Sequence, residues 1–401
     1  MIEDIYLDPL YWLLFLMGML VFRTAVGFRI LDFKFIIGMY FAQYIAHLTL
    51  IFGLSDYLLF CSLFFAAFIF GYRGYAAVPN LVLVRGAERD DIDKRVVLIS
   101  KAFLFSYYVW RISTVPIWVG ALDLATRLEK QQENRALFFL GIVMVPLFVA
   151  FMYDCVRKGK FGWSSRLLIV ITALGALSTG SKITILPLIL SYIGVSAYLG
   201  RRIRISPRIV FGIGAGIATI FVMLLMYFPF LSLGEILDMM LYRVVANTDN
   251  LEYLYTLNVA PSQYPFSGVI SIVPFVSKVL GAQIDYPYGV WLHGMRFGDW
   301  TGFGPNAGFL AEQYGNLSWG GLVVGLGLGA LVRWTERSHS AFRAMILSFS
   351  YTLLVESTVF FMSLFFCIGV LFLAYALNGL IRTLFRKIDL PKGGPSGAAI
   401  G

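Results

Sequence analysis

The chain has few charged residues: Asp, Glu, Lys and Arg make up 14% of its 401 residues, against about 25% in soluble domains. Apolar residues make up 59%, which excludes an ordinary soluble globular protein. Polar low-complexity sequence is also scarce, which excludes a disordered protein. The composition therefore predicts an all-α polytopic membrane protein.

Cysteine and histidine are equally scarce. Three cysteines lie in or beside apolar segments without metal-ligand spacing: Cys61, Cys155 and Cys367. They exclude a disulfide framework. Only three histidines occur, which argues against a multi-histidine zinc or di-iron site: His47, His293 and His339. We expect neither a metal nor another cofactor.

Long apolar runs, by contrast, are many. A bilayer core of about 30 Å needs about 20 apolar residues per helix. This criterion predicts about eleven spans, near 10–28, 34–54, 56–72, 96–119, 136–154, 165–179, 182–200, 209–230, 316–333, 341–360 and 362–382. Tight hairpins are expected at 54–56, 179–182 and 360–362. The first run lacks a basic start and an A-x-A exit, so we expect a retained helix.

The connecting loops alternate in charge. One set is basic and includes Arg29, Lys34, Arg73, Arg157 and Arg201, whereas the other set is short or acidic. The positive-inside rule places the basic set in the cytoplasm. We therefore expect the N-terminus outside, which for a bacterial inner membrane is the periplasm, and the C-terminus in the cytoplasm. The net charge of +9 then faces anionic lipid and requires no nucleic-acid partner.

One loop is too long for a connector. The spans divide the chain into helices 1–8 (1–230), a large periplasmic loop (231–315), helices 9–11 (316–383) and a cytoplasmic tail (384–401). Loops of this length are usually functional or linkers. Within it, 236–255 has the spacing of an amphipathic interfacial helix, and 266–279 is apolar but too short to span. We expect function in this loop.

Residues 286–304 of the loop mix aromatic rings, glycines and three polar groups. Tyr288, Trp291 and Trp300 are suited to stacking on sugar rings, beside His293, Arg296 and Asp299. An interfacial aromatic belt is the alternative. A belt does not require the polar set, which favours a binding role.

Ionisable residues inside the spans are costly and indicate function by default. At 1.5 Å per residue, four of them fall toward the periplasmic ends: His47, Arg111, Lys182 and Glu356. A structural ion pair between Arg111 and Glu356 is the alternative for those two residues.

Two further motifs are set aside. Asp91-Ile92-Asp93 resembles the D-x-D of metal-dependent sugar transferases, but it lies in a basic loop and is expected to be a solvated charge run. The glycines between Gly320 and Gly329 are expected to form a small-residue packing face.

Ser178-Thr-Gly-Ser-Lys182 resembles the T-G-S-[RK] signature of the Wzy-type oligosaccharide repeat-unit polymerases, which make O-antigen or capsule. The segment from Gly304 to Gly320 resembles the stretch before that family's ninth or tenth helix. The resemblance covers nearly the whole topology and implies a GT-C-like architecture in the bacterial inner membrane. The related O-antigen ligases share it, but His293 is followed here by Gly294 rather than by Asn, Ser or Gln.

The resemblance implies that a glycan on undecaprenyl diphosphate is transferred to a sugar hydroxyl of a second lipid-linked unit, with a chain-length regulator protein as a partner. The leaving diphosphate needs cations, for which the candidates are Lys182, Arg296, Arg243 and Arg111. The acceptor hydroxyl needs a general base, for which the candidates are His293, Glu312 and Asp299. A ligase is one alternative, and a flippase or transporter for the same lipid is another.

Overall fold

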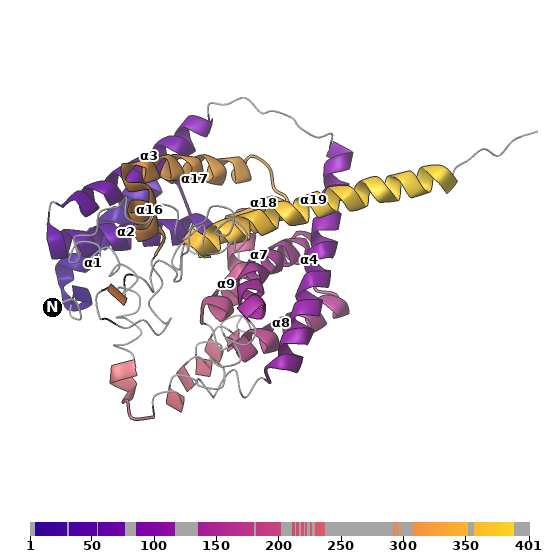
Figure 1. Cartoon of the computed structure of the whole chain (residues 1–401), viewed down its shortest axis with the longest axis horizontal. Helices are drawn as coiled ribbons and strands as arrows, with labels where there is room; N and C mark the ends of the chain where they lie inside the picture. Colours follow the sequence, from indigo (N-terminus) through magenta and orange to yellow (C-terminus); the bar gives the residue numbers. More distant parts are fainter. Residues whose placement is uncertain are drawn as a thin grey trace, which may run out of the picture.

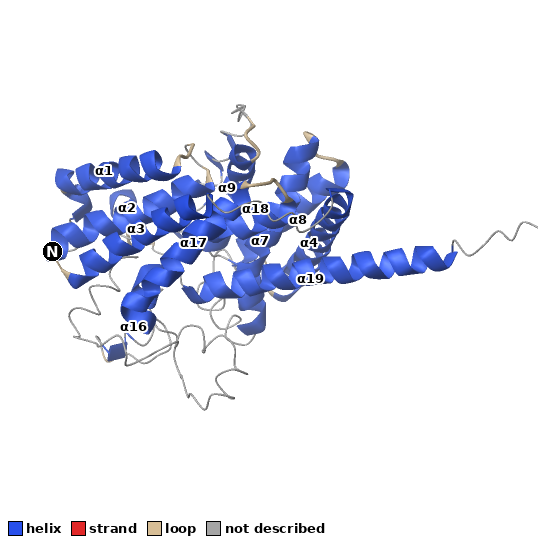
Figure 2. Cartoon of the chain, turned by 90° about the horizontal axis from the view of Figure 1, so that it is seen from above, coloured by secondary structure: helices blue, strands red, loops and turns tan. Residues whose placement is uncertain are grey.

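A computed structural model describes residues 5–29, 32–53, 55–76, 86–116, 135–179, 182–201, 308–351 and 357–388, with short pieces between 211 and 236 and between 292 and 298. These residues form α-helices and short 3-10 helices, with no strand among them (Figure 2). The elements are η1 (Ile5–Leu7), α1 (Pro9–Val26), α2 (Phe33–Phe52), α3 (Asp56–Ala76), α4 (Gly86–Thr114), α7 (Arg135–Lys158), α8 (Trp163–Thr179), α9 (Lys182–Tyr198), α16 (Phe309–Leu317), η4 (Ser318–Gly320), α17 (Gly321–Glu336), α18 (Ala341–Leu347), η5 (Ser348–Tyr351) and α19 (Ser357–Ile388).

The first two helices begin and end where local chemistry requires it. The Asp8 carboxylate accepts a hydrogen bond from the Leu10 backbone N–H at 2.8 Å, and Asp32 accepts one from Phe35 at 2.7 Å. Such N-caps satisfy backbone donors that a helix leaves unpaired. Gly27 and Gly53 end the helices with φ of 67° and 58°, values that glycine adopts without steric cost.

The helices pack in two groups that α18 and α19 connect (Figure 1). One group contains α1, α2, α3, α16 and α17, and the other contains α4, α7, α8 and α9. The C-terminal part of α19 extends away from both groups in both views (Figures 1 and 2). A shared aromatic and aliphatic core runs through both groups.

The closest helix contact is between α3 and α17. A Cβ atom added to Gly325 would lie 2.9 Å from the Phe64 carbonyl oxygen, and one added to Gly329 would lie 2.7 Å from the Tyr72 backbone nitrogen. The two backbones therefore meet through glycines, as small residues allow in membrane helices. The predicted small-residue face is confirmed at Gly321, Gly325 and Gly329, whereas Gly327 faces open space.

The helix ends collect at two opposite sides of the bundle. Ends that carry basic residues contact one another through Lys34 with Glu336 (2.6 Å), Arg73 with the Ala25 carbonyl (3.2 Å), Arg201 with the Arg157 carbonyl (2.7 Å) and Arg157 with Asp93 (3.6 Å). We call this side the basic end. At the opposite end, Tyr11 of α1 packs on Ala46 of α2, and the rings of Tyr57 and Tyr314 lie 5.0 Å apart.

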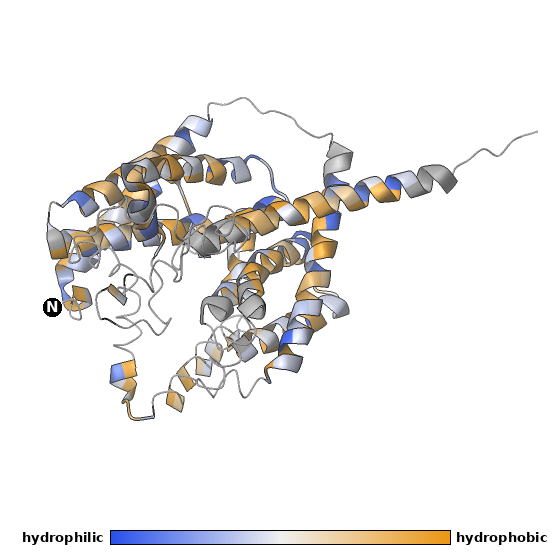
Figure 3. Cartoon of the chain, viewed as in Figure 1, coloured by the Kyte–Doolittle hydropathy of each residue, from blue (hydrophilic) through white to orange (hydrophobic). Residues whose placement is uncertain are grey.

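Several helices are suited to a membrane. Among the described residues, five are long and apolar enough to cross one, within α1, α2, α3, α4 and α19. Large apolar side chains on α1 and α19 are exposed, including Leu16 at 62% and Phe372 at 70%. Hydrophobic residues make up much of the described part of α19 (Figure 3), so its exposed side chains, like those of α1, form apolar surfaces. These surfaces are what lipid tails cover in a membrane protein.

Two predicted hairpins are confirmed, because α2 ends at Phe52 before α3 begins at Asp56, and α8 ends at Thr179 before α9 begins at Lys182. The break predicted at 360–362 is wrong. Helix α19 runs without interruption from Ser357 to Ile388, since Phe360, Phe361 and Met362 include no helix breaker. The helical segment before it is short instead, with seven residues in α18 followed by η5.

The expectation for Asp93 was also wrong. Its side chain is buried, accepts a hydrogen bond from the Ala341 backbone N–H at 2.6 Å and pairs with Arg157. Ala341 is the first residue of α18. A carboxylate is stabilised there because the helix dipole presents unpaired N–H groups at that end. Asp93 thus holds α18 against α4 rather than facing water.

Candidate functional site

Helix α16 is inserted beside α3 at the opposite end. The ring of Phe309 lies 6.1 Å from that of Phe64, and the ring of Tyr314 lies 4.9 Å from that of Phe60. Phe64 is eight residues past the start of α3, or about 12 Å along its axis. Helix α16 therefore begins at that depth within a candidate membrane span and runs back toward the surface.

The chain then reverses direction between α16 and α17. Ser318 adopts a φ of 52°, and Gly321 packs against Phe60 and the Gln313 backbone. Helix α17 runs parallel to α3, because Gly321, Gly325 and Gly329 meet Phe60, Phe64 and Phe68 in turn. The rings of α16 contact α3 in the reverse order. The boundary that the sequence placed at 315–316, between loop and helix, falls inside α16.

Polar side chains enter the interior on α16. Glu312 is 1% exposed and Gln313 is 3% exposed. The Oε1 atom of Gln313 has no hydrogen-bond partner among the described residues. Glu312, one of the three candidate bases, is thus inside the protein, where burying a carboxylate is costly unless surrounding groups stabilise it.

A polar face of α2 lies next to α16. Tyr40, Gln43, Tyr44 and His47 are buried, and their spacing places them on one side of the helix. The Tyr40 hydroxyl accepts a hydrogen bond from the Leu310 backbone N–H at 3.0 Å, which joins this face to the start of α16. His47 is fully buried, and neither ring nitrogen has a hydrogen-bond partner in the described part of the chain.

Arg111 lies at the opposite end of the second helix group. Its side chain is 1% exposed, and Nη2 donates to the Ser178 carbonyl at 3.4 Å. Ser178 begins the Ser178-Thr-Gly-Ser-Lys182 motif, and Lys182 is the first residue of α9. The fold therefore brings Arg111 to the motif across 67 residues of sequence. The interior position expected for His47 and Arg111 is confirmed.

The remaining predicted residues lie outside the described part of the chain. They are His293, Asp299, Arg296, Arg243, Trp291, Trp300 and Tyr288, together with Glu356 and the side chain of Lys182. Leu292 is described, and it is fully buried in the main core. One point of the long loop thus packs into the helix bundle.

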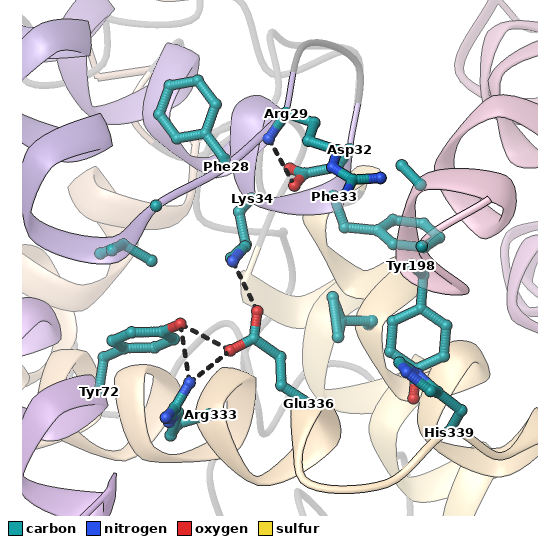
Figure 4. A pocket seen from close by; sticks show the side chains of 15 residues that line it. Phe28, Arg29, Asp32, Phe33, Lys34, Tyr72, Tyr198, Arg333, Glu336 and His339 are labelled. Carbon is teal, nitrogen blue, oxygen red and sulfur yellow. Dashed lines mark hydrogen bonds and ion pairs between the residues drawn. The ribbon is translucent and has the colours of Figure 1, made fainter. Parts of the chain in front are cut away.

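The basic end contains a cavity of about 600 Å³ that none of these residues lines (Figure 4). Its lining includes Arg29, Asp32, Lys34, Tyr72, Tyr198, Arg333, Glu336 and His339. Glu336 is the centre of the network, since its carboxylate pairs with Lys34 at 2.6 Å and Arg333 at 3.2 Å and accepts the Tyr72 hydroxyl at 2.6 Å.

Asp32 has a different role in the same cavity. Its carboxylate accepts hydrogen bonds from the Arg29 and Phe35 backbone N–H groups at 3.0 and 2.7 Å. Burial raises the pKa of Asp32 above its usual value, and these two N–H donors oppose that shift. Sequence patterns did not indicate this cavity, because its residues come from the ends of six helices and the turns beside them.

Within the described residues, no group of three or more His, Cys, Asp or Glu side chains is placed to hold a metal ion. Comparison with known proteins found no match among family models, curated proteins or solved structures.

Proposed function

We propose that this chain is a glycosyltransferase that polymerises undecaprenyl-diphosphate-linked oligosaccharide repeat units at the periplasmic face of the bacterial inner membrane. The observation that supports this best is the buried Arg111 guanidinium at the Ser178-Thr-Gly-Ser-Lys182 motif. On insertion scales an arginine costs about 2.5–3.5 kcal/mol at the centre of a membrane span and less toward its ends, and Arg111 lies in the last turn of α4 yet is buried. An ionisable residue kept in a span despite this cost indicates a functional role.

The proposed topology has eleven spans, a periplasmic N-terminus and a large periplasmic loop. The clustering of Lys34, Arg73, Arg157 and Arg201 at one end of the bundle supports it, because that end would be cytoplasmic by the positive-inside rule. The Arg111 and Lys182 positions then fall on the periplasmic side. That is the side on which a lipid diphosphate carries its translocated glycan.

Arg111 and Lys182 are proposed to bind the diphosphate, together with Arg296 and Arg243 from the loop. Negative charge grows on the diphosphate as its bond to the sugar breaks. Cations fixed in place beforehand stabilise that transition state without reorganising. Tyr288, Trp291 and Trp300 would stack on sugar rings, as aromatic faces suit their C–H surfaces.

The acceptor hydroxyl is proposed to lose its proton to His293, Glu312 or Asp299. A neutral imidazole has a pKa near about 6.5, suited to accepting a proton at neutral pH. Glu312 enters the interior on α16, beside the polar face of α2.

A transporter for the same lipid is the second candidate, favoured by the charged cavity at the basic end. A transporter needs a polar path between the two ends. In the first helix group the space between them is filled by packed rings of Phe22, Phe41, Phe64, Phe65 and Phe68. This aromatic cluster supports the enzyme over the transporter.

The experiment supplies purified full-length protein with a defined lipid-linked repeat unit and analyses the glycan on a gel. A polymerase produces a ladder, whereas a ligase transfers a unit once to a different acceptor and a transporter produces no new glycosidic bond. Lys182→Ala, Arg296→Ala and Arg111→Ala should each lower the rate by about a hundredfold, the loss typical of one transition-state donor.

Lys182→Arg should retain more activity than Lys182→Ala, because it keeps the charge. Arg201→Ala is the matched control, since Arg201 is an exposed cation at the basic end. The proposal fails if the three alanine variants make normal ladders while Arg201→Ala does not.

A further inference from the structure

The cavity at the basic end has no part in the proposed polymerase chemistry, yet its lining is strongly charged. Three cations, Arg29, Lys34 and Arg333, face two carboxylates, Asp32 and Glu336, which leaves one positive charge in excess. The cavity is open to the surface at Arg29, whose side chain is exposed.

Both carboxylates are already engaged by other groups of the cavity. Asp32 is engaged by the backbone N–H groups of Arg29 and Phe35. Glu336 is shared between Lys34 and Arg333, so that one negative charge faces two positive ones (Figure 4). The Nε–H of Arg333 is buried and has no acceptor among the described residues. A cationic site with a spare buried donor is suited to an anion.

Part of the remaining wall is apolar. Val26, Phe28, Phe33 and Leu347 line the same cavity. A volume of about 600 Å³ is within the usual range for small-molecule sites, about 300–1,000 Å³. The combination of clustered cations and aromatic surface fits a phosphate group that carries an apolar substituent.

We propose that this cavity binds the phosphate group of an anionic ligand through Arg29, Lys34 and Arg333, supplied either by a phospholipid of the adjoining leaflet or by free phosphate. Arginine and lysine both bind phosphate oxygens through charge-assisted hydrogen bonds. Glu336 competes with the ligand for the same cations, so it limits the affinity. The apolar wall holds the glycerol and first carbons when the ligand is a lipid.

The test uses the full-length protein in a neutral detergent and measures binding by isothermal titration calorimetry. The probes are dioctanoyl phosphatidylglycerol, dioctanoyl phosphatidylcholine and inorganic phosphate. Wild-type protein should bind phosphatidylglycerol at least tenfold more tightly than phosphatidylcholine, whose choline cancels the charge. Arg29→Gln should weaken phosphatidylglycerol binding by about tenfold, and Glu336→Gln should tighten it.

The opposite signs expected for Arg29→Gln and Glu336→Gln separate this proposal from general destabilisation, which would weaken binding in both. Arg166→Gln is the control, because Arg166 is an exposed cation of α8 near the basic end that does not line the cavity. Its affinity should equal that of wild type. Inorganic phosphate that binds as tightly as phosphatidylglycerol identifies free phosphate as the source, and weaker binding identifies the lipid.

Equal binding of phosphatidylglycerol and phosphatidylcholine would overturn the proposal. It would also be overturned if neither phosphatidylglycerol nor inorganic phosphate bound. The same holds if Arg29→Gln and Glu336→Gln both left the affinity for phosphatidylglycerol unchanged. The glycan ladder assay is independent of these outcomes, so failure of the phosphate site leaves the polymerase proposal standing.

Discussion

A side chain added at Gly329 should destabilise the protein, because the backbones of α17 and α3 are in contact at this residue. A Cβ atom at Gly329 would overlap the Phe68 carbonyl oxygen and lie 2.7 Å from the Tyr72 backbone nitrogen. Ordinary contacts between heavy atoms are about 3.5 Å or longer, so the overlap with the Phe68 carbonyl oxygen requires the helices to separate by about 1.5 Å. Overpacking of this kind typically costs about 1–3 kcal/mol. Gly329→Ala should therefore lower the melting temperature of the purified protein.

The matched control is two residues away on the same helix. Gly327 has nothing within 4 Å of an added Cβ. Glycine to alanine gains up to about 1 kcal/mol of helix propensity at either position, so Gly327→Ala should leave the protein as stable as wild type or more stable. Thermal unfolding in detergent, followed by tryptophan fluorescence, compares the two variants. Equal melting temperatures for Gly329→Ala and Gly327→Ala would refute the close α3–α17 packing.

Two further predictions concern the topology and the base. With cysteines placed singly at Ser267 and Ser338, a membrane-impermeant thiol reagent added to intact spheroplasts should label the first and not the second; the reverse pattern would invert the assigned orientation. His293→Ala should lose most polymer at matched expression, as judged by glycan ladders in cells, because it removes the loop's only imidazole; wild-type polymer length and amount would exclude histidine as the base.

The sequence predicted the features that depend on local composition. Apolar length and charge scarcity predict membrane-spanning helices, and five described helices have the required length and hydropathy. The hairpin between Thr179 and Lys182 and the packing face of Gly321, Gly325 and Gly329 follow from spacing within one segment. Local patterns succeed here because a helix in lipid needs apolar residues along its whole length and small residues where another helix packs closely against it.

Burial of single residues was partly predictable. An arginine or histidine within an apolar run has to lie inside the protein or reach the interface, and Arg111 and His47 are buried as expected. Asp93 was predicted to be solvated because its neighbours in sequence are charged, but it is buried. Its partner, the Ala341 N–H, is 248 residues distant. Sequence proximity gives no information about such a partner.

Only the tertiary structure decided which segments meet. It placed α16 about 12 Å along α3, brought Arg111 to Ser178 and assembled Lys34, Tyr72 and Glu336 from three helices around one cavity. Hydropathy and periodicity determine that a helix is buried and which face it buries, but many pairings of helices bury the same apolar area. The choice among those pairings depends on steric fit between surfaces far apart in the chain, such as the glycines of α17 against the backbone of α3.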